Sequence, residues 1–273
     1  MTARTAIITG GAGGLGLAMA HGLLADGHRV ALIDNDAGAT GRARDALRDT
    51  VGESLAVVAD VSDEAAVEAA VATVTEAFGP VEILINNAGI GPSSIRPDAE
   101  RRLPGVAEVT PELWARFFAV NLTGSMLMLR AVVAGMQAGG WGRVINNTTS
   151  FFTMLRVLPY GATKAALESA SAVWAKELDG SGVTVNVVVP GGPTDTAFID
   201  DQSGINRDKM LRPEVMAPPI RWLASEQSGA TTGRRFIAAL WDPHLPAAQA
   251  AEKAGAPIGW PELAAATVVW PDD

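Results

Sequence analysis

A chain of 273 residues can form one large α/β domain or two small domains, and 48% of its residues are hydrophobic. The formal net charge of −9 argues against a nucleic-acid partner, which requires a basic face. The absence of cysteine excludes disulfides, a thiolate nucleophile and cysteine-based zinc sites. No apolar run approaches the roughly 20 residues that span a bilayer, and the N-terminal residues lead directly into a strand-like run. We expect a soluble cytoplasmic protein with no membrane partner.

Short apolar runs alternate with longer amphipathic stretches along the chain. The runs that indicate buried strands are 6–8, 30–33, 55–58, 83–85, 144–145 and 183–189. Helices are expected at roughly 14–26, 38–50, 63–78, 110–138 and 160–180. This alternation predicts a Rossmann-type α/β fold, a doubly wound parallel sheet of about seven strands with helices on both faces. We expect one domain over 1–240 and a C-terminal extension over 241–273, packed on the domain or on a neighbouring subunit.

Residues 9–16, with the sequence TGGAGGLG, follow the first expected strand directly and precede an apolar helix. We refer to them as the glycine loop. Glycines allow the backbone to turn tightly and approach a pyrophosphate, and the next helix offers unpaired N–H groups at its N-terminus. Such stretches also occur as plain turns, but this position between a strand and a helix favours dinucleotide binding.

The second expected strand ends at Asp34. A carboxylate at this point accepts hydrogen bonds from an adenosine ribose and repels the 2′-phosphate of NADP. Neither the glycine loop nor the two residues after Asp34 supply a cation for that phosphate. We therefore expect NAD as the cofactor, and an NADP reductase of fatty-acyl type is disfavoured.

Six short motifs occur in an order and at a spacing that match one protein family. They are Thr9-Gly10-x-x-x-Gly14-x-Gly16, Asp60-Val61, Asn86-Asn87-Ala88-Gly89, Asn121 within VNLTG, Tyr160-Gly161-Ala162-Thr163-Lys164 and Pro190-Gly191. On these residues the chain resembles the short-chain dehydrogenases/reductases, in their single-domain NAD-dependent branch, over roughly residues 5–240. The resemblance implies a cofactor site made of Gly10, Gly14, Leu15, Gly16, Asp34, Asp60, Val61, Asn87, Ala88, Gly89, Tyr160, Lys164, Pro190 and Gly191.

Tyr160 and Lys164 lie four residues apart on an expected helix, so their side chains share one face. A free phenol has a pKa of about 10, and a neighbouring ammonium favours the phenolate and lowers that pKa. The resemblance implies that Tyr160 exchanges a proton with the substrate oxygen and that Lys164 also holds the nicotinamide ribose. It implies that Asn121 holds a water that relays protons from Lys164. A surface pair at helical spacing is the structural alternative, but Tyr160 is the only tyrosine in the chain.

One catalytic position departs from the family pattern. The serine that hydrogen-bonds the substrate oxygen in the family falls here at Thr149, when the pattern is anchored on residues 142–146. Ser150 has the expected residue type but lies one position later. We favour Thr149, because a shift of one residue at a strand end points the side chain the other way. A capping or turn role for both hydroxyls is the alternative.

The segment after Pro190-Gly191 carries one extra residue relative to the family. The threonine that binds the nicotinamide amide is therefore assigned to Thr196, with Thr194 as the alternative. Residues 192–212 are expected to form the substrate lid. The candidate substrate-pocket residues are Ser150, Phe151, Phe152 and Phe198, for which ordinary packing is the alternative. Arginines that could recognise an anionic group, or face solvent instead, are Arg96, Arg101, Arg102 and Arg156.

The leading hypothesis is reversible, NAD-dependent hydride transfer between a secondary alcohol and its ketone, with Asn121, Thr149, Tyr160 and Lys164 as the catalytic set. The alternative is a catalytically weak NAD-binding regulatory or scaffold protein of the same fold, motivated by the displaced hydroxyl. The three histidines show no ligand spacing, so no catalytic metal is expected. The resemblance implies a homo-oligomer, a tetramer or dimer formed through the helices that carry Asn121 and Tyr160.

Overall fold

The computed structural model describes residues 2–264, which form one sheet of eight strands. The strand order is β3-β2-β1-β4-β5-β6-β7-β8, and all neighbours up to β7 are parallel. The strands are β1 (Thr5–Thr9), β2 (Arg29–Asp34), β3 (Ser54–Val58), β4 (Ile83–Asn86), β5 (Gly142–Asn147), β6 (Val183–Val189), β7 (Arg234–Ile237) and β8 (Gly255–Pro257). The expected parallel α/β sheet is confirmed, and the additional strand, β8, is antiparallel to β7.

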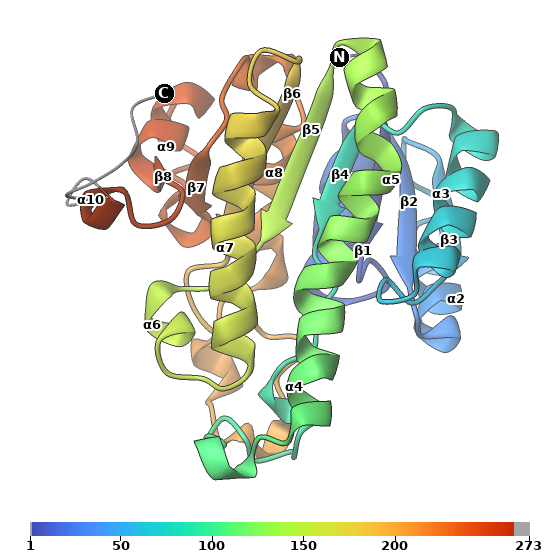
Figure 1. Cartoon of the computed structure of the whole chain (residues 1–273). Coiled ribbons are helices and arrows are strands. Elements are labelled where there is room, and N and C mark those ends of the chain that lie inside the picture. Colours follow the sequence, from blue (N-terminus) through green and yellow to red (C-terminus); the bar gives the residue numbers. More distant parts are fainter. Residues whose placement is uncertain (1, 265–273) are drawn as a thin grey trace.

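Helices cover both faces of this sheet (Figure 1). One face carries α1 (Gly14–Ala25), α2 (Ala37–Ala46), α8 (Ala217–Leu223) and α9 (Ala247–Ala254). The other face carries α3 (Glu64–Phe78), α5 (Gly124–Gly139) and α7 (Tyr160–Glu177). Shorter helices are α4 (Pro111–Phe118), α6 (Phe151–Met154) and α10 (Pro261–Ala264).

Each central strand contributes to two apolar layers, because successive side chains point to opposite faces. Ile8 and Ile85 pack with α1 and α8, whereas Ile7 and Leu84 pack with α3 and α5. The strand order reverses between β1 and β4, so the loops after these two strands diverge and leave a crevice at the carboxyl end of the sheet. In Figure 1 this is the lower edge, where α4 and α6 lie.

The helix expected at 110–138 is divided in two. α4 and α5 are joined by a π turn over Ala119–Thr123, and Asn121 lies in the middle of that turn. A π turn inside a helix is often found at a functional site. By length and composition alone the run Pro111–Gly139 could cross a membrane. Here α5 packs against the sheet within the second apolar layer, as the core helix of a globular protein does.

The C-terminal extension adds to the sheet. β8 pairs with β7, and the backbone N–H of Ile258 donates to the carbonyl of Gly233 at 3.0 Å. Ala250, Ala251 and Ala254 of α9 are buried. The edge of β7 is therefore covered by the chain's own residues. The remainder of the expected extension, residues 265–273, lies outside the described residues.

Candidate active site

A cavity of about 990 Å³ occupies the crevice at the carboxyl end of the strands. It is lined by the glycine loop, the ends of β2 to β6, the start of α7 and the lid. The expected site residues that line it are Gly10, Gly14, Leu15, Asp34, Asp60, Val61, Asn87, Ala88, Gly89, Thr149, Ser150, Phe152, Tyr160, Lys164, Pro190, Gly191, Thr196 and Phe198. The glycine loop, the strand ends, α7 and residues 192–212 thus converge on one space large enough for a dinucleotide and a substrate.

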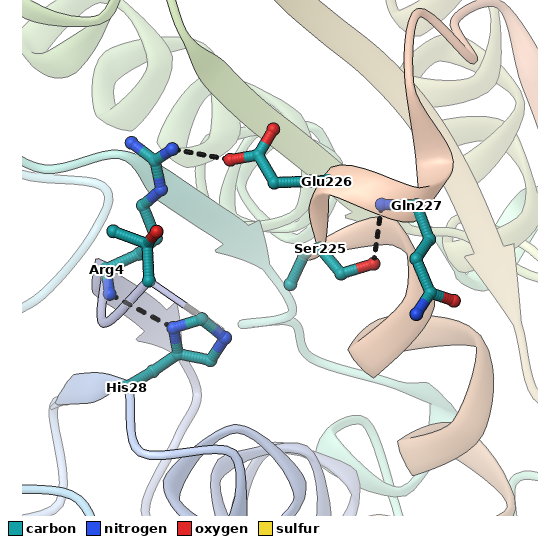
Figure 2. Close-up of a pocket in the computed structure, with 7 residues that line it drawn as sticks. Arg4, His28, Ser225, Glu226 and Gln227 are labelled. Atoms are coloured by element: carbon teal, nitrogen blue, oxygen red, sulfur yellow. Dashed lines mark hydrogen bonds and ion pairs between the residues drawn. The ribbon is translucent and has the colours of Figure 1, made fainter.

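A second, smaller cavity of about 240 Å³ lies at the opposite end of the sheet (Figure 2). Its lining includes Arg4, which precedes β1, and His28, which precedes β2. The Arg4 guanidinium donates to Glu226 at 2.6 Å, and the Arg4 backbone N–H donates to Nδ1 of His28 at 3.1 Å. The charged group of this cavity is thus already paired, whereas the large cavity contains polar groups that face open space.

The glycine loop is shaped as a cradle for phosphate. α1 begins after Gly13, which has no side chain to cap the helix, and the space around Gly13 is open. The N–H groups of the first turn therefore have no side-chain cap and can bind an anion. A Cβ at Gly16 would lie 2.1 Å from the carbonyl oxygen of Gly10, so only glycine permits this tight turn. These residues fit a dinucleotide pyrophosphate.

The carboxylates of Asp34 and Asp60 lie at two strand ends beside the cradle. Asp34 accepts hydrogen bonds from the backbone N–H groups of Ala12 at 3.2 Å and Asp36 at 3.1 Å. It is therefore fixed against the glycine loop, with its negative charge on the wall of the cavity. Asp60 accepts from the backbone and hydroxyl of Ser62 at 2.9 and 2.7 Å.

A belt of hydrogen bonds connects the glycine loop to Lys164 across the strand ends. The Asn87 amide donates to the carbonyls of Thr9 and Gly10 at 3.1 and 3.0 Å and accepts from Asn147 at 2.9 Å. The carbonyl of Asn147 accepts from Nζ of Lys164 at 2.8 Å. Sequence reasoning placed Thr9 in the glycine loop but missed Asn147 in this belt. The signal was present, because a polar residue in a buried strand requires a hydrogen-bond partner.

Tyr160 and Lys164 begin α7 and project into the cavity together, with Nζ 5.9 Å from the centre of the tyrosine ring. Burial lowers the pKa of Lys164 to about 8, because a desolvated ammonium is disfavoured. Burial raises the pKa of Tyr160 to about 12, and a hydrogen bond from the Thr149 hydroxyl opposes that rise. The expectation that Lys164 lowers the pKa of Tyr160 is not met in the protein alone, because desolvation of the phenolate dominates.

The structure separates the two candidate hydroxyls. Thr149 lines the cavity together with Tyr160, and its hydroxyl acts to lower the pKa of that tyrosine. The hydroxyl of Ser150 instead caps α6, where it accepts from the backbone N–H of Thr153 at 3.1 Å and contacts the Thr153 hydroxyl at 2.9 Å. Thr149 is therefore the hydroxyl that shares the substrate end of the cavity with Tyr160, and Ser150 has the capping role.

Asn121 is fully buried behind the cavity rather than on its wall. Its amide donates to the carbonyl of Ile90 and to the hydroxyl of Thr163, both at 3.0 Å, and accepts from the N–H of Ile90 at 2.8 Å. A Cβ on Gly89 would lie 3.2 Å from Oδ1 of Asn121 and 3.6 Å from Nζ of Lys164. Asn121 thus connects the loop after β4, at Ile90, to α7, at Thr163, the residue that precedes Lys164. Its role in a water relay stays a prediction.

Residues 192–212, the expected lid, contribute to the lining of the cavity. Thr196 packs against Gly14 of the glycine loop, where a Cβ on that glycine would lie 3.1 Å from it. Thr194 is buried and its hydroxyl donates to Gly192 at 3.2 Å, so Thr196 is the better placed of the two to meet a cofactor. The Phe198 ring lies 5.8 Å from the Tyr160 ring, centre to centre.

Three of the four expected substrate-pocket residues, Ser150, Phe152 and Phe198, line the cavity. Phe151 does not: its ring faces away, 4.4 Å from the Arg235 guanidinium and 5.5 Å from the Trp260 ring. The helix α6 directs adjacent phenylalanines to different sides, so only Phe152 of the pair reaches the cavity.

The candidate arginines have different environments. Arg156 lines the cavity and stacks on Phe152 at 4.4 Å, whereas Arg96 pairs with Asp98 and Glu108. Arg102 pairs with Asp98, and Arg101 packs against Gly204. Only Arg156 of these four is placed to meet a substrate. Within residues 2–264, no three acidic or histidine side chains converge as metal ligands.

A phosphate cradle at the crevice of a parallel sheet, joined by hydrogen bonds to a lysine beside a tyrosine, defines a dinucleotide-dependent oxidoreductase. The family model for short chain dehydrogenases matches residues 4–203. The chain belongs to this family, whose members bind a nicotinamide cofactor.

The relatives differ in what they act on. Fluoren-9-ol dehydrogenase of Terrabacter sp. (strain DBF63) is 28% identical over 258 residues, which cover 88% of this chain and 71% of that protein. L-sorbose reductase from Gluconobacter frateurii, in complex with NADPH and L-sorbose, is similar with a TM-score of 0.74 at 25% identity, over 87% of this chain and 95% of the other. The 3-ketoacyl-(acyl-carrier-protein) reductase from Brucella melitensis, in complex with NADH, is similar with a TM-score of 0.71 at 29% identity. The match covers 84% of this chain and 93% of the other.

Proposed function

We propose that the protein is an NAD-dependent oxidoreductase that transfers a hydride reversibly between a secondary alcohol and its ketone. The observation that carries this proposal is that Thr149, Tyr160 and Lys164 line one cavity together with the phosphate cradle of the glycine loop. Two hydroxyls at one point can hold a single substrate oxygen from two directions. A bound nicotinamide cofactor supplies the hydride acceptor or donor.

In the direction of alcohol oxidation, Tyr160 accepts the proton of the substrate hydroxyl while Thr149 donates a hydrogen bond to the same oxygen. A base with a pKa of about 12 is too weakly ionised at neutral pH, so further positive charge is needed at the site. Lys164, held against the carbonyl of Asn147, brings an ammonium to the neighbourhood of the phenol. Asn121 keeps Lys164 and the loop after β4 in register, through Thr163 and Ile90.

The preference for NAD over NADP rests on Asp34. Its carboxylate is fixed by Ala12 at the wall of the cavity, where a 2′-phosphate would be repelled. Related structures hold NADPH in one case and NADH in the other, so the family alone does not decide the cofactor. The local charge favours NAD in this chain.

The substrate end of the cavity favours an apolar secondary alcohol or ketone. Phe152, Phe198, Ile199 and Ile205 line it, and Phe198 covers the ring of Tyr160. Arg156 and Arg116 both line the cavity, so a negative group remote from the carbinol carbon would be tolerated. The alternative of a catalytically weak NAD-binding scaffold was motivated by the displaced hydroxyl, and the contact between Thr149 and Tyr160 argues against it.

We also propose that the protein forms a homo-oligomer through α4, α5 and α7. Trp114 and Met126 on the first two helices and Val173 on the third leave apolar surface exposed in the single chain. Light scattering of the purified protein measures the number of subunits, and a monomer at micromolar concentration would contradict the proposal.

The test of the reaction is the absorbance of NADH during turnover of a panel of secondary alcohols and ketones, including 9-fluorenol, 9-fluorenone and L-sorbose. Wild type and Tyr160→Phe are compared at equal occupancy by NADH, which is measured by fluorescence. Loss of kcat by about 1,000-fold in Tyr160→Phe, with NADH still bound, is the expected result. Full activity in Tyr160→Phe contradicts the mechanism, and NADH binding without turnover of any compound supports the scaffold alternative.

A further inference from the structure

Two opposite charges are buried beneath the loop that carries Thr149. Glu168, on α7, is 0% exposed, and Arg235, on β7, is 4% exposed. Nε of Arg235 lies 3.8 Å from Oε1 of Glu168. The pair lies outside the lining of the large cavity. Glu168 follows Lys164 by one helical turn, so both residues lie on the same face of α7.

This pair holds the two residues at the end of β5. The hydroxyl of Thr148 donates to Oε2 of Glu168 at 2.7 Å. Nη2 of Arg235 donates to the backbone carbonyl of Thr149 at 2.5 Å. Both charged groups therefore bind the segment from which the Thr149 hydroxyl projects to Tyr160.

The C-terminal extension closes over the same pair. The backbone N–H of Gly259 donates to Oε1 of Glu168 at 3.4 Å. The Arg235 guanidinium stacks on the Phe151 ring at 4.4 Å. The Trp260 ring also packs on Phe151, with the two ring centres 5.5 Å apart. The extension thus completes a shell around the two charges, directly after β8.

Packing alone does not account for charges at this place. Burying two ions carries a desolvation penalty that their attraction often fails to recover, and apolar side chains of similar volume commonly replace such pairs without loss of stability. Burial lowers the pKa of Arg235, and the charge of Glu168 opposes that effect. A guanidinium, however, offers several N–H donors in a rigid plane, which fixes a carbonyl in direction as well as distance.

We propose that Arg235 and Glu168 are positioning residues that aim the Thr149 hydroxyl at Tyr160, and that the segment 255–260 completes this support. The proposal rests on the proposed function, in which Thr149 binds the substrate oxygen. It assigns to the C-terminal extension a part in the chemistry of a site that it does not touch. Neither charged residue lines the cavity in which substrate and cofactor would bind.

The main test is the double variant Glu168→Gln/Arg235→Met, which removes both charges. The amide oxygen can still accept from the N–H of Gly259, and the amide NH2 can donate to the hydroxyl of Thr148. Removal of one charge alone would leave the other buried without its partner, which destabilises the fold. We expect kcat to fall about tenfold or more while the dissociation constant of NADH stays unchanged. In a Thr149→Val background the double variant should produce little further loss, because both changes act through one hydroxyl.

Arg143 provides a matched control. It is also 4% exposed, lies at the other end of β5, and donates to the backbone carbonyls of Gly142 and Gly229. Arg143→Met therefore removes an equally buried guanidinium that has no contact with Thr149. We expect it to lower the melting temperature without changing kcat at temperatures where the protein is folded.

A second readout does not depend on turnover. Tyr160 is the only tyrosine in the chain, so biosynthetic incorporation of 3-fluorotyrosine places one fluorine reporter on the catalytic ring. Its NMR signal and titration midpoint report the hydrogen bond from Thr149. We expect Thr149→Val and Glu168→Gln/Arg235→Met to shift this signal alike and to raise the midpoint, and Arg143→Met to leave both unchanged. The milder Trp260→Ala, which retains both charges, should shift it in the same direction by a smaller amount.

The outcomes separate the two proposals. If Thr149→Val loses activity and shifts the fluorine signal while the double variant matches Arg143→Met in both measurements, the positioning role is wrong and the proposed function stands. If Thr149→Val changes neither measurement, the assigned role of Thr149 fails, and the positioning role falls with it. Should the double variant fail to fold, Trp260→Ala decides, and an unchanged signal and kcat in that variant overturn the proposal.

Discussion

The two ends of the sheet differ in how a buried or half-buried cation is paired. At the amino end, Arg4 pairs with Glu226 (Figure 2). It also pairs with Glu82 and stacks on Trp141 at 3.9 Å. At the carboxyl end, Lys164 is buried against a backbone carbonyl rather than a carboxylate. Paired ions stabilise the first end, whereas the second retains a cation whose burial carries a free-energy penalty.

This difference indicates where the chain gives up stability for function. Groups with strongly shifted pKa values cluster where chemistry is performed, because shifted proton affinity is what acid–base catalysis requires. Tyr160 and Lys164 have such shifts, and both result from burial. Substitutions at the carboxyl end should therefore change activity more than stability, and substitutions at the amino end should do the reverse.

The largest expected effect belongs to Lys164→Met, which should lower kcat by about 1,000-fold and yet stabilise the protein. Burial lowers the pKa of Lys164 from 10.5 to about 8, so the ammonium destabilises the fold at neutral pH by about 3 kcal/mol. The lost hydrogen bond to Asn147 offsets about 1 kcal/mol of the gain. We expect the free energy of unfolding at pH 7 to rise by about 2 kcal/mol, as measured by urea denaturation.

The pH dependence supplies the check on Lys164. Between pH 8 and 10.5 the unfolded chain binds more protons at this lysine than the folded protein, so the penalty in wild type disappears as pH rises. The stability difference between Lys164→Met and wild type should therefore be full below pH 8 and decrease above it. A variant less stable than wild type at pH 7 would show that the ammonium is well paired.

At the carboxyl end of the sheet, the sequence predicted the features that depend on steric contacts between neighbouring residues. It did not predict the contacts between residues that are distant in the chain. Gly16 and Gly10 approach so closely that glycine is required, which is a local property visible in the motif. Arg235 and Glu168 meet through tertiary packing of β7 on α7, and no spacing in the sequence indicates that contact. Phe151 was assigned to the substrate pocket because the orientation of α6 cannot be derived from its neighbours in the chain.

The C-terminal extension shows the same limit. Gly255–Pro257 lacks the alternation and β-branched residues of a strand, and becomes β8 only because the edge of β7 is available. The helix α8 contains two prolines in its first turn, where proline is tolerated, and the sequence pattern did not predict it. By contrast, β1 to β6 were predicted from continuous apolar runs. Apart from the edge strand β3, these strands are buried on both faces of the sheet and are therefore apolar for most of their length.

The next prediction compares adjacent hydroxyls at the carboxyl end. Thr149→Val should lower kcat by about 100-fold, because it removes a hydrogen bond to the reacting oxygen. Ser150→Ala should leave kcat unchanged and lower the free energy of unfolding by about 1 kcal/mol, because it removes the cap of α6. Equal losses of kcat in both variants would mean that the loop after β5, rather than one hydroxyl, is required.

Asp34→Ser should shift the cofactor preference toward NADP by about tenfold in the ratio of kcat/KM values, because it removes the charge that repels a 2′-phosphate. Asp36→Asn is the matched control, because asparagine retains the cap of α2 while removing a neighbouring charge. If both variants change the ratio equally, the preference arises from the general negative potential rather than from Asp34.

The smallest effect on activity is expected from Arg4→Met at the amino end of the sheet, where stability rather than kcat should change. Arg4→Met leaves Glu82 partly buried without its guanidinium partner and removes the stacking on Trp141. The expected loss is about 2 kcal/mol in the free energy of unfolding, with kcat and KM for NAD unchanged. Urea denaturation and steady-state kinetics measure the two quantities on the same preparation. A fall in kcat would mean that β1 transmits strain from Arg4 to the glycine loop at its other end, and the two ends of the sheet would then be mechanically coupled rather than independent.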